Sequence, residues 1–234
     1  MRRLVLFGCL LLRLMPFALA DEPRDDVLMA VDHLVLAAPD LDEGIAAVEA
    51  MTGVRASYGG SHPGLGTRNA LLSLGPRVYL EIIAPDPAQS TWQSPRPFRV
   101  DEIQAPTLVT WAAKSGDVEG LVERTLPGGE SLGTPQAGSR KRPDGVTLSW
   151  VLSVPTREVA DGVVPFFIDW GDTPHPAASA PSGATLIALR LVHPEPGRVR
   201  ETLDILGIDA VVTHGARPAL IAELMTPNGA VTLE

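Results

Sequence analysis

Carboxylate side chains stand inside apolar stretches of the sequence at two places. Glu81 interrupts the apolar stretch Tyr79–Ile83, and Asp169 stands between two apolar residues in the same way. A buried carboxylate is costly unless a cation or several hydrogen-bond donors accompany it, so both positions indicate a site. Because side chains alternate along a strand, a second interpretation is that either carboxylate points to a solvated face.

Histidines add a second set of candidates, since an imidazole can ligate a metal or carry a proton near neutral pH. His33 lies on the first apolar strand, and His62 lies in a glycine-rich loop. His62 could act as an acid or base or as a ligand, or it could be a solvated loop residue. His175 stands between two prolines on a stiff segment. His193 and His214 are predicted to be turn residues.

Three segments share one pattern of a strand, an amphipathic helix and a closing glycine. The predicted strands and helices are 31–36 with 40–51, 107–112 with 117–126, and 185–190 with 196–206. In each helix the apolar residues recur at the spacing of one buried face, and the glycine suits the left-handed position after a helix. The further predicted strands are 55–58, 69–73 and 78–83; 146–154 and 163–170, after a polar loop at 138–144; and 210–213, 219–225 and 230–233.

These patterns predict an α+β fold of repeated βαβββ modules. We expect modules 30–86 and 106–171 to pair around a cleft in a domain over 30–178, with a third βαβββ module at 184–234. Such a module has one apolar sheet face, which pairing buries. The proline-rich stretches 85–106 and 173–181 are the predicted linkers.

The amino terminus is typical of a signal peptide over residues 1–20, followed by a tail over 21–29. The apolar run Leu4–Leu12 is far shorter than a bilayer span, so no retained membrane anchor is predicted. Export makes the protein periplasmic or secreted. The alternative is a start at Met29, which would leave the protein in the cytoplasm. If cleavage follows Ala20, the removal of Cys9 leaves no cysteine for disulfides.

Composition and missing motifs exclude several classes of function. The 234 residues carry a formal net charge of −9, so no nucleic-acid partner is expected. The sequence has no P-loop, no dinucleotide-binding glycine motif after a strand, no His-Glu-x-x-His motif and no Gly-x-Ser-x-Gly elbow. Nucleotide, zinc-protease and serine-hydrolase chemistry therefore have no support.

Tandem βαβββ modules with a histidine on the first strand resemble the vicinal oxygen chelate superfamily and, more narrowly, its glyoxalase-like domain family. The segments that carry the resemblance are 32–41, 60–69, 79–86, 165–171 and 175–176. The resemblance implies a cleft between two modules and a divalent metal, which could be Mn, Fe, Ni, Co or Zn. In that superfamily the metal ligands stand on the first and last strands of each module.

Carried over residue by residue, the resemblance implies His33, Glu81 and Asp169 as metal ligands. It also implies His62 as the catalytic acid or base. We further expect Asn69 and His175 to contact the bound ligand. The chain departs from the pattern at 107–112, which offers no His, Glu or Gln and so lacks a fourth protein ligand.

The predicted function is that of a glyoxalase-like, metal-dependent lyase, isomerase or dioxygenase acting on a small oxygenated metabolite, in a possible homodimer. The alternative is a protein of the same fold that binds or sequesters a small molecule without catalysis. The missing fourth ligand favours binding, whereas His33 together with Glu81 favours an enzyme.

Overall fold

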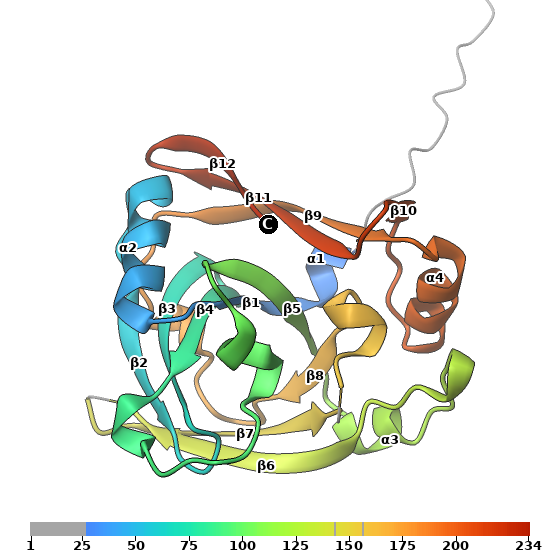
Figure 1. Ribbon diagram of the computed structural model, residues 1–234, viewed down its shortest axis with the longest axis horizontal. Helices are drawn as coiled ribbons and strands as arrows, with labels where there is room; N and C mark the ends of the chain where they lie inside the picture. The colour runs from blue at the N-terminus through green and yellow to red at the C-terminus, as the bar shows by residue number, and fades with distance from the viewer. Residues whose placement is uncertain (1–26, 143, 156) are drawn as a thin grey trace, which may run out of the picture.

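The computed structural model describes residues 27–142, 144–155 and 157–234, so the predicted signal peptide lies outside the described residues. Two β-sheets and a few short helices make up the described chain (Figure 1). The helices and strands are α1 (Val27–Ala30), β1 (Val31–Ala37), α2 (Leu41–Thr52), β2 (Ser57–His62), β3 (Thr67–Gly75), β4 (Val78–Pro85), β5 (Thr107–Lys114), α3 (Val118–Val122), β6 (Thr134–Lys141), β7 (Thr147–Val154), β8 (Phe166–Asp169), β9 (Thr185–His193), α4 (Pro196–Ile205), β10 (Val212–His214), β11 (Ala219–Thr226) and β12 (Gly229–Leu233).

The first two modules share one eight-stranded sheet, whose order is β2-β3-β4-β1-β5-β8-β7-β6. Within each module the first strand runs parallel to the last, and the antiparallel pair β1 and β5 joins the two modules. The sheet curls until its edge strands β2 and β6 approach each other (Figure 1). Arg140 of β6 donates to the carbonyl oxygen of Gly59 in β2 across this seam. The α+β fold of paired βαβββ modules is confirmed.

The helix predicted over 40–51 forms because its ends are capped. The Asp40 carboxylate accepts the backbone N–H groups of Asp42 and Glu43 at 2.8 and 3.2 Å, which satisfies two donors of the first turn. Gly53 closes the helix with a φ of 73°, as its position in the pattern predicts. The buried face of α2 packs on the convex side of the curled sheet.

The second module differs from its prediction in two elements. The helix expected over 117–126 is limited to α3, because Gly120 weakens it and the chain turns at Pro127. The loop expected at 138–144 overlaps β6, an edge strand whose side chains are mostly exposed. An edge strand needs no apolar stretch, so hydrophobic patterning gave no signal there.

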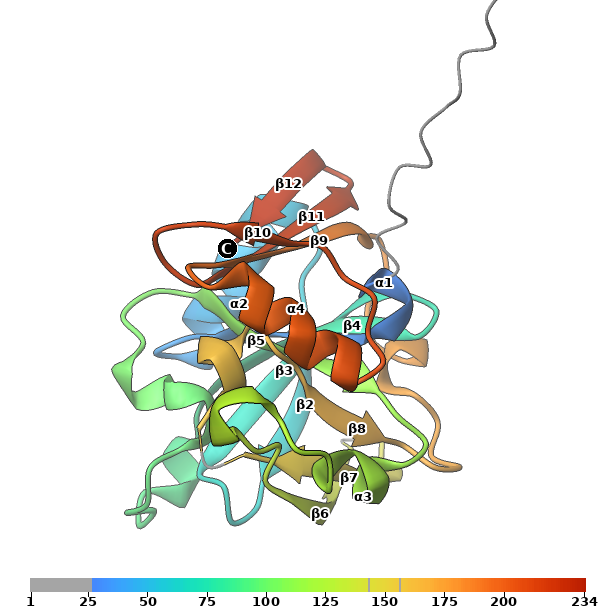
Figure 2. The same ribbon diagram turned by 90° about the vertical axis from the view of Figure 1, so that its right-hand side faces the viewer.

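The third unit keeps the predicted order of elements but not the strand order of the other two modules. Its four-stranded sheet runs β10-β9-β11-β12, so the first strand pairs with the second and third strands rather than with the last. Figure 2 shows this sheet on the convex side of the eight-stranded sheet. A single apolar core lies between the two sheets and α2. The third unit packs on that core, and this packing sets its strand order. A repeated order of elements along the chain does not specify how the strands pair.

The end of the predicted amino-terminal tail that the structure describes, 27–29, and both predicted linkers contribute residues to packed structure. Val27 of α1 is fully buried and packs beside β9, so the end of the predicted tail belongs to the core. Both predicted linkers place apolar side chains, such as Phe98 and Ala177, in a second core on the concave side of the curled sheet. Short 3₁₀ turns support these and other loops, at Pro87–Gln89, Pro97–Glu102, Pro127–Gly129, Val159–Gly162 and Pro176–Ala178. Within the described residues, none of the helices has the length and apolar character needed to cross a membrane.

Candidate functional site

Three of the predicted site residues meet on the concave face of the curled sheet. Asn69, Glu81 and His33 lie on the neighbouring strands β3, β4 and β1. Glu81 Oε1 accepts a hydrogen bond from Asn69 Nδ2 at 2.6 Å, and Glu81 Oε2 lies 3.6 Å from His33 Nε2. Glu81 is only 7% exposed, so the interpretation that it faces solvent is wrong. The sequence argument that a carboxylate in this strand needs polar partners holds.

Asp32 completes this arrangement, although sequence analysis did not select it. Its Oδ1 accepts from His33 Nδ1 at 2.8 Å and from Trp170 Nε1 at 3.2 Å. Strand alternation would turn Asp32 away from His33, but β1 has a register irregularity between Val31 and His33 in its pairing with β5. A bulge of this kind re-aims a side chain, and no sequence pattern marks it here.

His175 supports Asp32 rather than lying on an exposed segment. His175 Nδ1 accepts the backbone N–H of Ala177 at 3.3 Å, so Nε2 carries the ring proton and faces Asp32 Oδ2 at 3.2 Å. Burial alone would raise the pKa of the Asp32 carboxyl, but the hydrogen bonds from His175 and His33 outweigh burial and hold that pKa well below its usual range. Asp32 is therefore ionised at neutral pH, at the centre of three donors.

His62 joins the cluster from the end of β2, a strand position rather than the predicted loop. Its Nδ1 lies 2.9 Å from Thr67 Oγ1, and its Nε2 lies 3.2 Å from Asn69 Nδ2. Burial lowers the pKa of His62, and the nearby charge of Glu81 opposes this only in part. A neutral His62 that accepts from Asn69 has both ring nitrogens engaged, so it positions Asn69 rather than offering a free base.

Asp169, by contrast, is not brought to this cluster. Its neighbours Ile168 and Trp170 pack into the concave core, so alternation along β8 turns Asp169 to the other side. Its Oδ1 accepts the backbone N–H of Gly171 at 2.8 Å, which is a local turn contact.

Aromatic rings hold His33 in place on the concave face. The ring of Tyr79 stacks on His33 at a centroid distance of 4.5 Å and an interplanar angle of 18°. Phe166 of the second module meets the same imidazole edge-on at 5.5 Å. Burial raises the pKa of the Tyr79 hydroxyl, and the charges of Asp32 and Glu81 add to this, so Tyr79 stays neutral. His33 therefore has a fixed ring plane as well as a fixed tautomer.

Comparison with known proteins identifies the family of this chain. The sequence profile of the glyoxalase-like domain matches residues 31–207, which is most of the chain. The chain belongs to the glyoxalase-like domain family. The expected resemblance to the vicinal oxygen chelate superfamily is thereby confirmed.

One solved structure shows the same fold at low identity, and others are similar to parts of the chain. A hypothetical protein from Staphylococcus aureus is 13% identical, with a TM-score of 0.58 over 87% of this chain and 85% of that one. A methylmalonyl-CoA epimerase in complex with methylmalonyl-CoA and NH4+ is 17% identical, with a TM-score of 0.41 over 63% of this chain and 98% of that one. The methylmalonyl-CoA epimerase from Mycobacterium tuberculosis is 18% identical, with a TM-score of 0.39 over 70% and 98%. No curated protein sequence matches the chain.

The metal implied by the family resemblance does not fit the side chains of this glyoxalase-like domain. His33, His62 and Glu81 are donors of a suitable kind, but Asn69 already bonds both His62 and Glu81. Ala112, the residue of module two paired with His33, has no donor atom in its side chain. Within the described residues, no three His, Cys, Asp or Glu side chains are arranged to hold an ion.

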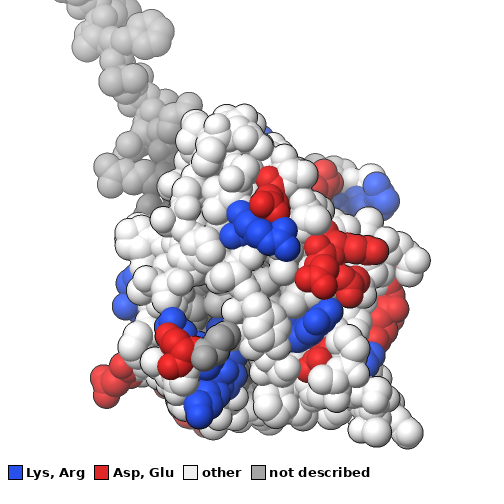
Figure 3. Space-filling model, turned by 90° about the vertical axis from the view of Figure 1, so that its left-hand side faces the viewer, with Lys and Arg blue, Asp and Glu red and all other residues white. Residues whose placement is uncertain are grey.

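A small hollow opens near this cluster, at the seam between β2 and β6. Its volume is about 180 Å³. The residues that line it are Ser57, Tyr58, Gly59, Leu71, Arg140, Arg142, Asp144, Leu148, Pro176, Ser179 and Ala180. Figure 3 shows this side of the domain, where basic and acidic side chains lie side by side next to a hollowed area. Leu71 lies directly opposite Glu81 in the β3–β4 register, so the hollow approaches the cluster from that side.

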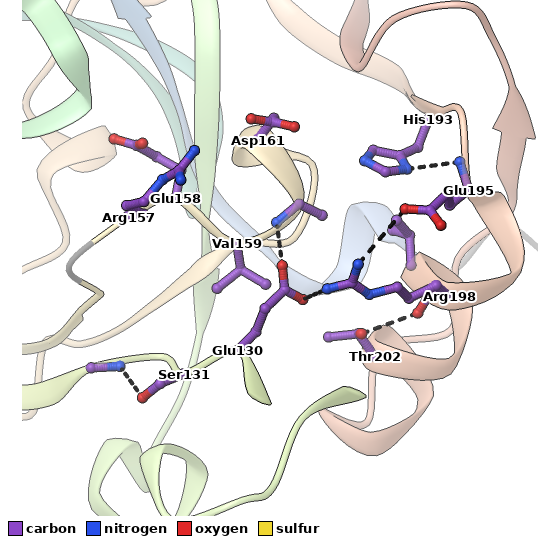
Figure 4. Close-up of a pocket in the computed structure, with 13 residues that line it drawn as sticks. Glu130, Ser131, Arg157, Glu158, Val159, Asp161, His193, Glu195, Arg198 and Thr202 are labelled. Atoms are coloured by element: carbon purple, nitrogen blue, oxygen red, sulfur yellow. Dashed lines mark hydrogen bonds and ion pairs between the residues drawn. The ribbon is translucent and has the colours of Figure 1, made fainter. Parts of the chain in front are cut away.

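A larger hollow, of about 450 Å³, lies elsewhere, between the second module and α4 (Figure 4). Arg198 pairs with two of the carboxylates that line it. Arg198 lies 3.1 Å from Glu130 and 3.7 Å from Glu195, and His193 accepts the backbone N–H of Glu195 at 3.0 Å. None of the predicted site residues lines it, and none of them lines the smaller hollow, which lies nearer to their cluster.

Proposed function

We propose that this glyoxalase-like protein is an enzyme that moves a proton on a small oxygenated metabolite, with His33 as the base. The observation that carries the proposal is the buried series Asp32, His33 and Glu81 on the concave face. Ionisable groups whose partners fix their protonation are typical of sites for acid–base chemistry.

Asp32 determines which nitrogen of His33 is basic. Because the ionised Asp32 holds the proton on Nδ1, the Nε2 lone pair is free and faces Glu81 Oε2 at 3.6 Å. That separation is too long for a direct hydrogen bond. In the proposed reaction, Nε2 takes a proton from the substrate carbon, and the imidazolium that forms is stabilised by Asp32.

Glu81 has a complementary role. Asn69 fixes its Oε1, which leaves Oε2 as the oxygen directed at His33. When His33 is protonated, Glu81 lies on the opposite side of the imidazolium from Asp32. His33 can then return the proton to a neighbouring atom of the substrate on the same side, which is an isomerisation.

Proton exchange with solvent tests this proposal even while the substrate is unidentified. A panel of small 2-hydroxy acids, 2-oxo acids and hydroxyketones is incubated with the protein in D₂O, and loss of each C–H signal is followed by ¹H NMR. We expect exchange for at least one compound, slowed roughly 100-fold or more in His33→Ala. Asp169→Asn is the matched control and should exchange at the wild-type rate. Equal exchange in His33→Ala overturns the proposal.

A second candidate function is binding without catalysis, and one observation favours it. Side chains of the 86–106 segment, including Phe98 and Val100, pack into the concave core, and His33 is only 3% exposed. A protein that sequesters a metabolite needs an enclosed site, but it does not need a basic side chain that the metabolite can reach. Compounds that bind to the wild type without any C–H exchange would establish this candidate instead.

We also propose that the chain is exported and cleaved after Ala20. The burial of Val27 supports a start upstream of Met29, because initiation there would delete a residue of the core. Intact mass of the protein from its native host tests this, and a chain that begins at Met29 would contradict it.

A further inference from the structure

His33 and Glu81 are buried, although a substrate has to reach them for the proposed reaction. They are 3% and 7% exposed, and α2 and the third unit cover the convex side of the curled sheet (Figure 2). Access is therefore from the concave side. Two segments place apolar side chains in the core on that side, 93–106 and 173–181. The segment that is bound more weakly to the sheet is the one that can open.

The segment 173–181 is bound firmly to the eight-stranded sheet. The carbonyl oxygen of Pro181 accepts the backbone N–H of Ser73 in β3 at 2.8 Å. His175 of the same segment faces Asp32 Oδ2 through Nε2 at 3.2 Å. Opening this segment would take one of its three donors from the buried, ionised Asp32, which is costly. This segment therefore stays in place.

Residues 93–106, here called the lid, are bound much more weakly. In Figure 1 the lid is the green segment that leads into β5 across the open front of the curled sheet. Among the described residues, it makes no backbone hydrogen bond to either sheet. Arg96 Nε donates to the carbonyl oxygen of Gly66 at 2.7 Å, and Arg99 lies 3.8 Å from Glu158. A segment with so few backbone hydrogen bonds opens at a lower free energy than the strands beneath it.

Phe98 connects the lid to the site. Its half-buried ring lies 5.5 Å from Phe166, which in turn meets the His33 imidazole edge-on at 5.5 Å. This closed position requires left-handed backbone angles at Phe98 and Arg99, with φ of 58° and 49°. Such angles persist in residues other than glycine only where surrounding contacts hold them. Opening the lid therefore costs apolar burial at Phe98 and Val100 but releases the strain of this turn.

We propose that the lid opens locally and gives a small molecule access to His33. This inference rests on the proposed function, because it describes how that same site is reached. Arg96 is the latch of the lid, since it bonds Gly66 outside the lid and pairs with Asp101 inside it. The closed lid keeps His33 and its partners enclosed, and the open lid admits the ligand. Enclosure of the site and access for turnover are then two states of one segment.

Acylation of His33 by diethyl pyrocarbonate measures lid opening without any knowledge of the substrate. The reagent attacks an imidazole nitrogen with a free lone pair, and mass spectrometry of peptides gives a rate for each histidine. His214 is exposed and serves as the reference within the same chain. We expect slow acylation of His33 that changes less than about twofold between 0 and 1 M urea, because local opening exposes little surface. Global unfolding would accelerate it about fivefold or more over the same interval.

Two variants loosen the lid by different means. Arg96→Met removes the latch, and Phe98→Ala removes the ring that packs on Phe166. Each should speed the acylation of His33 about fivefold or more, while the rate of His214 stays the same. Arg190→Met, which breaks an exposed ion pair on β9, is the matched control and should leave both rates unchanged. Thermal unfolding checks that each variant is folded, and Phe98→Leu, which keeps most of the apolar contact, should behave almost as the wild type does.

The outcomes separate the lid from the proposed function. Weakly urea-dependent acylation of His33 that Arg96→Met accelerates supports the lid, whether or not any compound exchanges its C–H proton. Acylation that rises with urea as steeply as global unfolding, or that Arg96→Met leaves unchanged, overturns the lid. The lid is also overturned if His33 stays unmodified when His214 has fully reacted. C–H exchange by a protein that fails these tests would keep the proposed function and would require entry by another route, such as the hollow at the seam.

Discussion

Substitution of Asp32 by Asn is the sharpest perturbation that the structure offers, because the two side chains have the same shape. Asp32 is 1% exposed and accepts from His33 and Trp170 through Oδ1 and from His175 through Oδ2. In the less costly orientation, the substituted amide keeps its oxygen toward His33 and Trp170 and turns its N–H group toward His175 Nε2. Two donors then face each other in a buried site.

The magnitude follows from that loss. A hydrogen bond to a charged group contributes about 1.5–3 kcal/mol, and an unpaired buried donor costs about 1–3 kcal/mol. Asp32→Asn should therefore lower the free energy of unfolding by about 2–4 kcal/mol at pH 7. Urea unfolding measures this directly. Asp169→Asn is the matched control, because the Asp169 carboxylate accepts in a local turn, and its effect should stay within about 0.5 kcal/mol.

The pH dependence gives the same prediction a second test. The folded pKa of Asp32 lies below the value of about 3.9 expected in the unfolded chain. The ionised carboxylate therefore stabilises the fold fully above that pH, and this stabilisation is lost as the pH falls toward the folded pKa. The difference in stability between wild type and Asp32→Asn should shrink when the pH is lowered from 7 to about 3. An equal difference at both pH values, or a loss no larger than that of Asp169→Asn, would refute the reasoning.

Three further predictions concern the cluster and its support. Because burial lowers the pKa of His62, its imidazole should stay neutral at pH 6, with the proton on Nδ1. Its contribution to the free energy of unfolding should therefore decline as the pH falls below the value of about 6.5 expected in the unfolded chain. ¹⁵N NMR of the imidazole checks this, and a protonated ring at pH 6 contradicts it. A Cβ at Gly44 would lie 2.7 Å from Ile82 Cγ2, so Gly44→Ala should destabilise by about 1–3 kcal/mol in urea unfolding; a gain in stability from helix propensity would show that the contact yields. After reconstitution with Mn, Fe, Ni, Co or Zn and desalting, elemental analysis should find no stoichiometric ion. One ion per chain that His33→Ala removes would establish the ligand set that the family resemblance implied.

The sequence predicts the fold well where one apolar face repeats. The modules, the caps of α2 and the strands that carry His33 and Glu81 all follow from hydrophobic period and glycine position. Edge strand β6 and the pairing order of β9 to β12 do not follow, because solvent exposure and docking decide them. The same limits apply to the hollow at the seam, since Arg140 of its lining comes from that unpredicted edge strand.

The sequence predicts only those site residues that stand within apolar strands. Glu81 and His33 stand out because a polar residue in an apolar strand needs partners. Asp32 is hidden by a register irregularity in β1, and the contact of His175 with Asp32 joins segments more than a hundred residues apart. Asp169 shows the converse error, because a matching position in a repeat does not guarantee the same face of a strand.

The two paired modules contribute different kinds of side chain to the surroundings of His33, and the segment that joins them takes part. Phe98 and Arg99 both adopt left-handed backbone angles, with φ of 58° and 49°, which is strained for residues other than glycine. This turn places the Phe98 ring 5.5 Å from Phe166, the side chain that also packs edge-on against His33. The second module thus contributes an apolar wall beside His33. The first module carries Asp32, His33 and Glu81, which are buried beside that wall, and the low local polarity strengthens the hold of Asp32 on His33.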